Sequence, residues 1–179
     1  MPFELQPHLK GTLLELRPLR PGDFPELYGV ASDPLIWEQH PQSDRYREEV
    51  FQVFFREAME SGGALAAVDS KDGRIIGSSR FAGYEPEKGE IEIGWTFLAR
   101  SHWGGTYNGE MKQLMLQHAF RFVNSVVFRI GPQNYRSQRA VEKIGGLRVG
   151  SRTDAAGRPS VIYQITGSAF ATLQRAMGA

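Results

Sequence analysis

Residues 90–110 read EIEIGWTFLARSHWGGTYNGE and contain three successive signals. The first four residues alternate between glutamate and isoleucine, which predicts a strand that continues to residue 98. Gly104 and Gly105 follow and favour a loop. The apolar side chains beyond the loop have the three- and four-residue spacing of a helix. They are Met111, Leu114, Met115, His118 and Phe122.

This strand–loop–helix succession is a candidate anion site. The first amides of a helix have no partner within the helix, and the helix dipole favours negative charge beside them. Gly104 and Gly105 would let a phosphate approach the backbone closely. The alternative is a plain tight turn, because paired glycines are weak evidence alone. The sequence has no GxGxxG, GxxxxGK[ST], HExxH or GxSxG motif, which argues against Rossmann, P-loop, zinc-protease and α/β-hydrolase chemistry.

Outside this stretch the chain alternates between short predicted strands and helices. Asp23 is expected to cap a short helix, and Ser43 a longer one over residues 44–60. Further helices are expected to begin at Asn134 and Ser168. An antiparallel meander followed by a strand–helix–strand–helix unit indicates a mixed α+β fold. The other predicted strands cover residues 13–16, 64–69, 74–84, 126–130, 147–152 and 161–165.

Length and composition are those of one globular domain. The chain has 179 residues and a mass of 20.1 kDa. We expect a single domain over residues 1–179, with its core at about 11–166. Twenty-one lysines and arginines face 20 aspartates and glutamates, which argues against a nucleic-acid module that acts by bulk charge. No apolar run is long enough to cross a bilayer, so no membrane partner is expected.

The chain contains no cysteine. This removes disulfides, cysteine nucleophiles and cysteine-bearing zinc sites, and it fits a reducing compartment. The first ten residues lack the apolar core of a signal peptide. We therefore expect a cytoplasmic protein that holds no metal. We expect it to be a monomer or a homodimer.

A second candidate site begins at Asn134. Residues 134–137 read NYRS and precede EKIG at residues 142–145. An asparagine just before a helical pattern is most often a helix N-cap, and Ser137 is then an ordinary first-turn serine. Neither residue indicates a function alone.

Taken together, these blocks resemble the GNAT superfamily of acyl-CoA-dependent N-acyltransferases, and within it the RimJ/RimL-like ribosomal-protein N-terminal acetyltransferases. The resemblance spans about Leu13 to Gly146. It implies a mostly antiparallel, twisted sheet of about seven strands flanked by helices, with a cofactor cleft where strand 90–98 and the next strand splay apart. The stretches that carry it, in the family's order, are LELRPL at 14–19 with Asp23, EIGW at 92–95, WGGTYNGE at 103–110, and residues 134–145.

The resemblance also implies acetyl-CoA as the co-substrate. Pantetheine would pair with the backbone of strand 90–98 at Thr96, Phe97 and Leu98, as an added strand does. Asn134 would contact the pantetheine arm, with Ser137 beside it at the cofactor. The pyrophosphate would lie on backbone amides of the loop and helix start, at Gly104, Gly105, Thr106, Tyr107 and Asn108.

Three positions depart from the family pattern. Ser101 stands where the family's loop has Gln or Arg, and Thr106 where it has a second small residue. Val141 stands where many members place a tyrosine that acts as an acid. Ser137 is the nearest hydroxyl on that helix, as in the RimL-like branch.

Amide formation from a thioester needs a neutral amine and a proton for the leaving thiolate. Without cysteine, direct attack in a ternary complex is the simplest route. Glu92 is the first choice for the base, and Glu90, on the same strand face, is the second. The alternative is that both carboxylates simply face water. Ser137 is the candidate acid.

The histidines and phenylalanines have simpler interpretations. His118 is expected in the core, and His8 and His102 show no partner in the sequence. His40 falls in the segment where the family binds its acceptor, which makes it a candidate substrate contact. Three phenylalanines at helical spacing are expected in the core, namely Phe51, Phe54 and Phe55.

Two functions remain open from the sequence. The first is an N-acetyltransferase whose acceptor is a small-molecule amine or a protein N-terminus. The second is a module on the same fold that binds CoA without turning it over. The acceptor class is not visible in the sequence.

Overall fold

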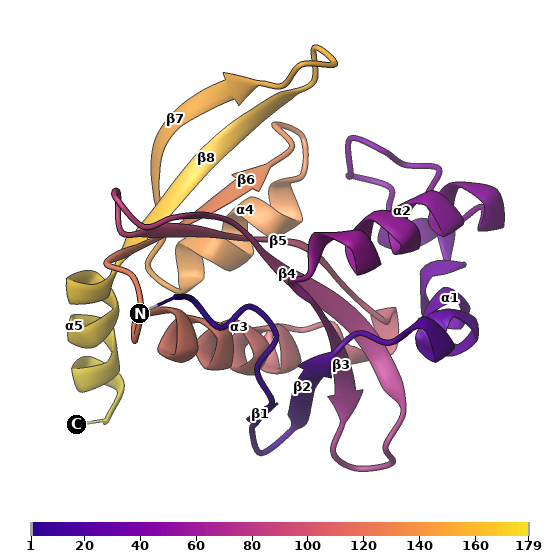
Figure 1. Cartoon of the computed structure of the whole chain (residues 1–179), viewed down its shortest axis with the longest axis horizontal. Coiled ribbons are helices and arrows are strands. Elements are labelled where there is room, and N and C mark those ends of the chain that lie inside the picture. The colour runs from indigo at the N-terminus through magenta and orange to yellow at the C-terminus, as the bar shows by residue number, and fades with distance from the viewer. Residues whose placement is uncertain (1, 179) are drawn as a thin grey trace.

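The computed structural model describes residues 2–178 as an eight-stranded sheet with helices on both faces (Figure 1). The strand order is β1-β2-β3-β4-β5-β6-β8-β7. Neighbouring strands are antiparallel except β5 and β6, which are parallel. This is the expected mixed and mostly antiparallel α+β fold. The strand beyond the expected seven is β1 (Leu9–Lys10), a segment of two residues.

The first five strands form the predicted meander. β3 (Ala64–Asp69) and β5 (Glu90–Leu98) have the predicted bounds. The turns that join β3 to β4 and β4 to β5 contain Gly73 and Gly89, whose positive φ angles of 74° and 62° favour glycine. The other two strands are β2 (Leu14–Pro18) and β4 (Ile75–Glu85).

The second half of the sheet begins with β6 (Ser125–Ile130), which lies beside β5. The chain then passes through helix α4 (Tyr135–Lys143) to a hairpin of β7 (Leu147–Thr153) and β8 (Pro159–Thr166). β8 lies between β6 and β7. The hairpin projects beyond the other strands, as Figure 1 shows.

The helices enclose one apolar core on each face of the sheet. α1 (Phe24–Ala31) and α2 (Glu48–Ser61) cover the first core, which contains Trp37 and the three predicted phenylalanines. α3 (Thr106–Ala119) lies across the opposite face, where its methionines pack against β5. Residues of α4 and of α5 (Gly167–Gly178) also pack against this second core.

His118 belongs to the second core, as predicted. It is 2% exposed, its Nε2 lies 2.8 Å from the Glu4 carbonyl oxygen, and the ring of Phe3 is its neighbour. The histidine is therefore a buried structural residue.

One predicted helix start and one predicted helix cap are wrong. α2 begins at Glu48 instead of residue 44, and Ser43 does not cap it. The Tyr28 hydroxyl donates to the Tyr46 carbonyl at 2.8 Å, and this tertiary contact helps to hold the preceding segment in turns. Asp23 does precede α1, but its carboxylate accepts two hydrogen bonds of 2.9 Å from Arg17 instead of capping the helix.

Candidate active site

β5 and β6 separate part-way along β5. Their pairing joins only Glu90–Glu92 to Ser125–Val127. Beyond this point β5 stays paired with β4 as far as Leu98, while β6 stays paired with β8 as far as Ile130. From Ile93 onward, the edge of β5 that faces β6 has no strand partner. This divergence is the splayed cleft that the resemblance implies.

A β-bulge shapes the free part of β5. Trp95 has a φ of 53°, and the register against β4 shifts between Ser78 and Arg80. Such a bulge bends a strand and redirects its side chains. Trp95 consequently packs against the core under α1 and α2, whereas Thr96 contacts α3.

α3 starts at the glycine loop, beyond the end of the same strand. Gly104 and Gly105 have φ angles of 119° and 98°, which explains the glycines, and a Cβ on either would meet nothing within 4 Å. No side chain caps the helix, and the Gly109 amide donates to the Gly105 carbonyl at 2.8 Å. The amides of the first turn, residues 106–108, are thus left without partners inside the helix. The loop has the donors that a pyrophosphate requires.

Glu92 lies at the last residue pair before the strands separate. It is 8% exposed, and Arg129 Nη1 lies 3.8 Å from its Oε1. Burial raises the pKa of Glu92 above its ordinary value, and the positive charges of Arg129, Arg152 and Arg80 reverse only part of this rise. A buried carboxylate with a raised pKa beside a cleft has the properties of a general base.

Glu90 shares the strand face of Glu92 but not its environment. Its Oε2 accepts hydrogen bonds from Ser125 Oγ at 3.1 Å and from Gln164 Nε2 at 3.5 Å. These bonds tie Glu90 to β6 and β8, so Glu92 is the candidate whose carboxylate is less engaged.

Residues 14–146 match the family described as Acetyltransferase (GNAT) domain. The chain belongs to the GNAT acetyltransferase family. The match covers both candidate blocks that the sequence singled out. No curated protein sequence gives a significant match.

Solved GNAT structures resemble this chain over nearly its whole length. A GCN5-related N-acetyltransferase from Brucella melitensis has a TM-score of 0.86 at 19% identity, with 98% of this chain and 85% of that one covered. Mycobacterium smegmatis RimJ in complex with CoA-disulfide has a TM-score of 0.66 at 20% identity, covering 91% and 88%. Spermidine N-acetyltransferase from Vibrio cholerae, in complex with CoA and spermine, has a TM-score of 0.69 at 13% identity, covering 90% and 99%. At these identities the likeness concerns the fold.

The predicted residues of α4 lie at its first turn. Asn134 is the N-cap, and its Oδ1 accepts a 3.3 Å hydrogen bond from the Ser137 amide. The Ser137 hydroxyl is partly exposed and makes no hydrogen bond to any residue from 2 to 178. Val141, which the resemblance aligns with a tyrosine of many family members, is 4% exposed and packs in the second core.

The predicted pantetheine residues already have some partners. Lys112 Nζ donates to Thr96 Oγ1, which also lies 2.8 Å from Ser79 Oγ. The carbonyl of Leu98 accepts a 3.0 Å hydrogen bond from Trp103 Nε1. The Thr96 bonds involve its side chain, so they do not occupy the backbone edge that faces β6. Lys112, which the sequence did not single out, lies in α3 and contacts β5 through the side chain of Thr96.

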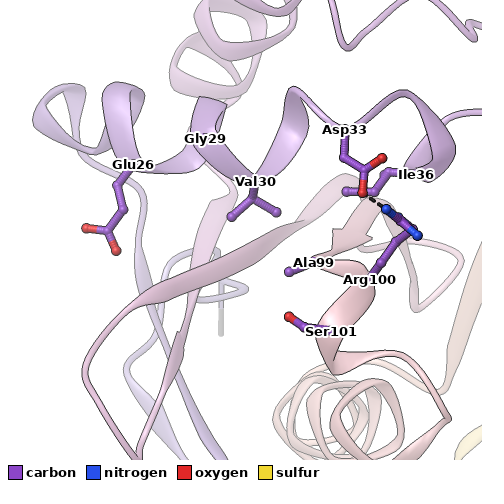
Figure 2. A pocket seen from close by; sticks show the side chains of 8 residues that line it. All are labelled: Glu26, Gly29, Val30, Asp33, Ile36, Ala99, Arg100 and Ser101. Carbon is purple, nitrogen blue, oxygen red and sulfur yellow. Dashed lines mark hydrogen bonds and ion pairs between the residues drawn. The ribbon is translucent and has the colours of Figure 1, made fainter.

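An open hollow of about 610 Å³ lies between α1 and the turn before the glycine loop (Figure 2). Val30 and Ile36 line one side and Ser101 the other. Asp33 and Arg100 form an ion pair at its rim, which ties the segment after α1 to this turn. None of the predicted catalytic or cofactor-binding residues lines the hollow.

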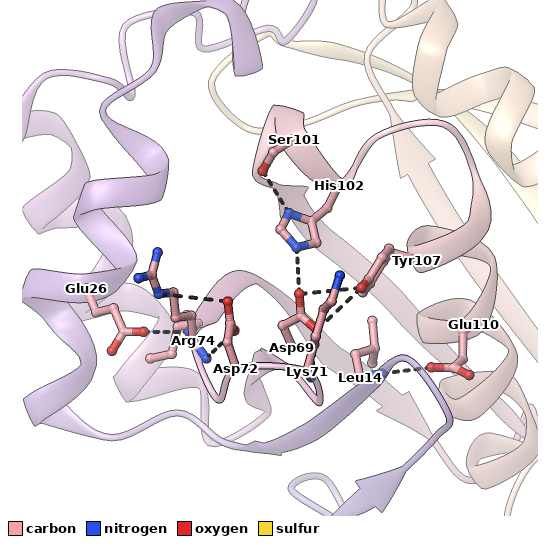
Figure 3. A network of polar contacts seen from close by, with 11 residues as sticks. Leu14, Glu26, Asp69, Lys71, Asp72, Arg74, Ser101, His102, Tyr107 and Glu110 are labelled. Atoms are coloured by element: carbon pink, nitrogen blue, oxygen red, sulfur yellow. Dashed lines mark hydrogen bonds and ion pairs between the residues drawn. The ribbon is translucent and has the colours of Figure 1, made fainter.

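A network of polar contacts holds the glycine loop, as Figure 3 shows. His102 Nε2 lies 2.8 Å from Asp69 Oδ2, and its Nδ1 lies 2.8 Å from Ser101 Oγ. The Tyr107 hydroxyl also donates to Asp69, at 3.4 Å. A hydrogen bond from the Lys71 amide and the contact with His102 hold the pKa of Asp69 below its ordinary value. His102 therefore has a partner that the sequence did not reveal.

Glu110 fixes the other end of the first turns of α3. Its carboxylate accepts hydrogen bonds of 2.8, 2.7 and 2.9 Å from the amides of Thr12, Leu13 and Leu14. Figure 3 shows the contact with Leu14. The helix start is thus anchored to β2 by Glu110 and to β3 by the His102 network.

Two negative findings concern residues 2–178. These residues contain no group of three or more metal-ligating side chains placed to hold a metal ion. None of their helices is both long and apolar enough to cross a membrane.

We expect Gly105→Asp to weaken CoA binding about tenfold or more, because it adds a negative charge at the amides proposed to hold the pyrophosphate. Gly105→Asn is the matched control, since Asn and Asp tolerate positive φ similarly and differ in charge. Calorimetric titration with CoA measures both. Equal affinities for the two variants would place the phosphates elsewhere.

Proposed function

We propose that this GNAT chain transfers an acetyl group from acetyl-CoA to a primary amine by direct attack in a ternary complex. The whole chain would act as one RimJ/RimL-like N-acetyltransferase domain. The observation that carries the proposal is the position of Glu92. Its buried carboxylate lies where β5 leaves β6, on the strand that leads to the uncapped start of α3.

The residues that would hold acetyl-CoA follow from the same geometry. The cofactor supplies the acetyl thioester. The free edge of β5 at Thr96–Leu98 offers backbone groups for an extended pantetheine arm. The Gly104–Asn108 backbone offers amides for the pyrophosphate, and Asn134 keeps its side-chain amide group for the arm while its Oδ1 caps α4.

Glu92 would convert the acceptor ammonium into the neutral amine by accepting its proton. A lysine-like amine has a reference pKa near 10.4 and an α-amino group one near 7.7–8.0, so an acceptor arrives largely protonated at neutral pH. Glu92 takes this proton directly or through water, and its raised pKa suits that task. The unbonded hydroxyl of Ser137 is the donor we assign to the leaving thiolate.

Thiol release from acetyl-CoA, measured against a panel of primary amines, tests the proposal directly. A parallel thermal melt with CoA separates binding from turnover, since ligand at 100 times its Kd stabilises a protein by about 2.7 kcal/mol. Binding with turnover of an amine supports the enzyme. Binding without turnover identifies a CoA-binding module, and absence of both refutes the cofactor assignment.

We expect Ser137→Ala to lower kcat by about 10²–10⁴-fold if the hydroxyl acts as the general acid, and to lower CoA affinity much less. The variant should fold well, because alanine favours the helix and the lost hydroxyl has no partner from residue 2 to 178. Ser168→Ala, in the first turn of α5, is the matched control. Wild-type turnover by Ser137→Ala would return Ser137 to the role of a helix residue.

A further inference from the structure

Arg80, on β4, is a buried cation that has no counterion within 4 Å among residues 2–178. It is 5% exposed, and its side chain makes no hydrogen bond and no ion pair within 4 Å to residues 2–178. Its guanidinium carbon lies 4.4 Å from the centre of the Trp95 ring and 5.6 Å from that of Phe54. Burial lowers the pKa of Arg80 to about 10, so it remains charged at neutral pH. Buried charges are ordinarily paired, which makes an unpaired guanidinium a feature that needs an explanation.

Arg45 also lies over the Phe54 ring, and the charge of Arg80 acts on it. Its guanidinium carbon is 4.8 Å from the Phe54 ring, and its side-chain partners are Gln42 and His40. Burial and the charge of Arg45 lower the pKa of His40 to about 3, so His40 is neutral. Arg45 also has no carboxylate within 4 Å in the described chain. Neither neutral His40 nor any carboxylate at this distance therefore balances its charge.

The charges around Glu92 are mainly positive. The positive charges of Arg80, Arg129 and Arg152 lower the pKa of Glu92. The charge of Arg158, in the β7–β8 hairpin, lowers the pKa of Arg45. The carboxylates whose negative charge raises the pKa of Arg45 or Arg80 are Glu57, Asp44 and Glu92 itself. Arg129 and Arg152 also act on Glu85, so these five arginines have four carboxylates among their charged neighbours, in a chain whose net charge is only +1. Such a surplus repels a polycationic acceptor and attracts an anionic group.

Arg80 and Glu92 are close neighbours on one face of the sheet. Arg80 pairs with Gly94 and Ala82 pairs with Glu92, which puts both side chains on the face covered by α2. Diagonal neighbours on adjacent strands lie about 7–8 Å apart at their backbones. A small zwitterion can therefore place its ammonium at Glu92 and its carboxylate at Arg80.

We propose that the acceptor is a small primary amine that also carries a carboxylate, with the carboxylate bound by Arg80 and Arg45. The proposal rests on the proposed function and names its acceptor class. Arg80 supplies a buried charge, and Arg45 supplies a partly exposed charge over the same Phe54 ring. Glu92 stays free for the amine. The reaction is unchanged, since the amine nitrogen forms the amide bond, the C–S bond breaks, and the thiolate takes a proton.

Matched acceptors isolate the carboxylate. The common L-amino acids are assayed for thiol release from acetyl-CoA beside their carboxamides and decarboxylated amines, with putrescine and spermidine included. We expect kcat/KM for the favoured amino acid to exceed that of its amide by about 10- to 100-fold, the usual range for hydrogen bonds to charged groups. Arg80→Gln and Arg45→Gln should reduce this preference, chiefly through KM, and Arg80→Lys should restore part of it. Arg175→Gln, on α5, removes one positive charge elsewhere and should change nothing.

A binding arm keeps the test independent of turnover. Thermal melts in saturating CoA are recorded with pools of N-acetyl amino acids and of their amides, which represent products with and without the carboxylate. Stabilisation by the acids alone, lost in Arg80→Gln, supports the proposal. Equal kcat/KM for acids and amides, or preference for putrescine or spermidine, overturns it while the acetyltransferase stands. Failure of every amine together with failure of CoA binding overturns the proposed function itself.

Discussion

Glu92→Gln is expected to lower kcat by about 10²–10⁴-fold, the usual contribution of general acid–base catalysis. Gln keeps the shape of the side chain and removes the group that accepts the proton. In the wild type the rate should fall as the pH drops through the raised pKa of Glu92, because the protonated carboxyl is no longer a base. This acidic limb should be absent from the rate–pH profile of the variant.

The same pKa shift fixes the expected effect on stability. Burial raises the folded-state pKa of Glu92, so the folded protein binds the proton more tightly than the unfolded chain does. The stability from this group is fully present below the unfolded pKa and is lost as pH rises through the folded pKa. At neutral pH, Glu92→Gln should therefore be as stable as the wild type or slightly more so.

Glu90→Gln is the matched control for catalysis. Its carboxylate is bonded to Ser125 and Gln164, and we expect a small effect on kcat. Rate–pH profiles of both variants discriminate the roles. A damaging Glu90→Gln beside a harmless Glu92→Gln would identify the other carboxylate as the base.

Lys112→Met is expected to stabilise the protein by several kcal/mol at or below pH 7, with about 5 kcal/mol as an upper bound. Lys112 is 5% exposed and has a hydroxyl, that of Thr96, as its hydrogen-bond partner. Burial lowers the pKa of its ammonium to about 7. Met fills a similar volume and removes a charge that has no counterion within 4 Å in the described chain.

The pH dependence of this gain distinguishes it from simple repacking. Between about pH 7 and 10 the unfolded chain keeps the Lys112 proton that the folded protein has released, so wild-type stability rises with pH. The advantage of Lys112→Met should shrink over this range in denaturant titrations. Lys10→Met replaces an exposed lysine and should show no such trend. A variant that is less stable than the wild type at every pH would refute this account of Lys112.

The sequence predicts those parts of the fold that depend on local pattern. The strict alternation at residues 90–93 gives a strand with the observed bounds, and the glycine loop precedes a helix as expected. The start of α2 is wrong because the segment before it is held by Tyr28 and by contacts of Arg45, which lie outside any local pattern. Local signals therefore locate elements well and their ends less well.

The candidate site is likewise predicted in part by local pattern and in part set by contacts between distant residues. Residues of the glycine loop and of β5 stand out by their order, and in the structure the loop follows the free part of β5 and leads into α3. The partner of His102 is Asp69, which lies 33 positions away, so no spacing rule reveals it. Arg80 and Lys112 look like ordinary charged residues in the sequence, and only the three-dimensional packing shows that both are buried with no counterion within 4 Å in residues 2–178.

The short seam between β5 and β6 has a mechanical consequence. The two halves of the sheet are joined by only three residue pairs. Helix α3 packs against the core beneath both halves and links them. A ligand bound in this gap, as we propose for acetyl-CoA, would connect the two halves of the sheet where strand pairs are missing. We therefore expect this junction to be stiffer with the ligand bound than without it, so that its rigidity changes with each binding and release.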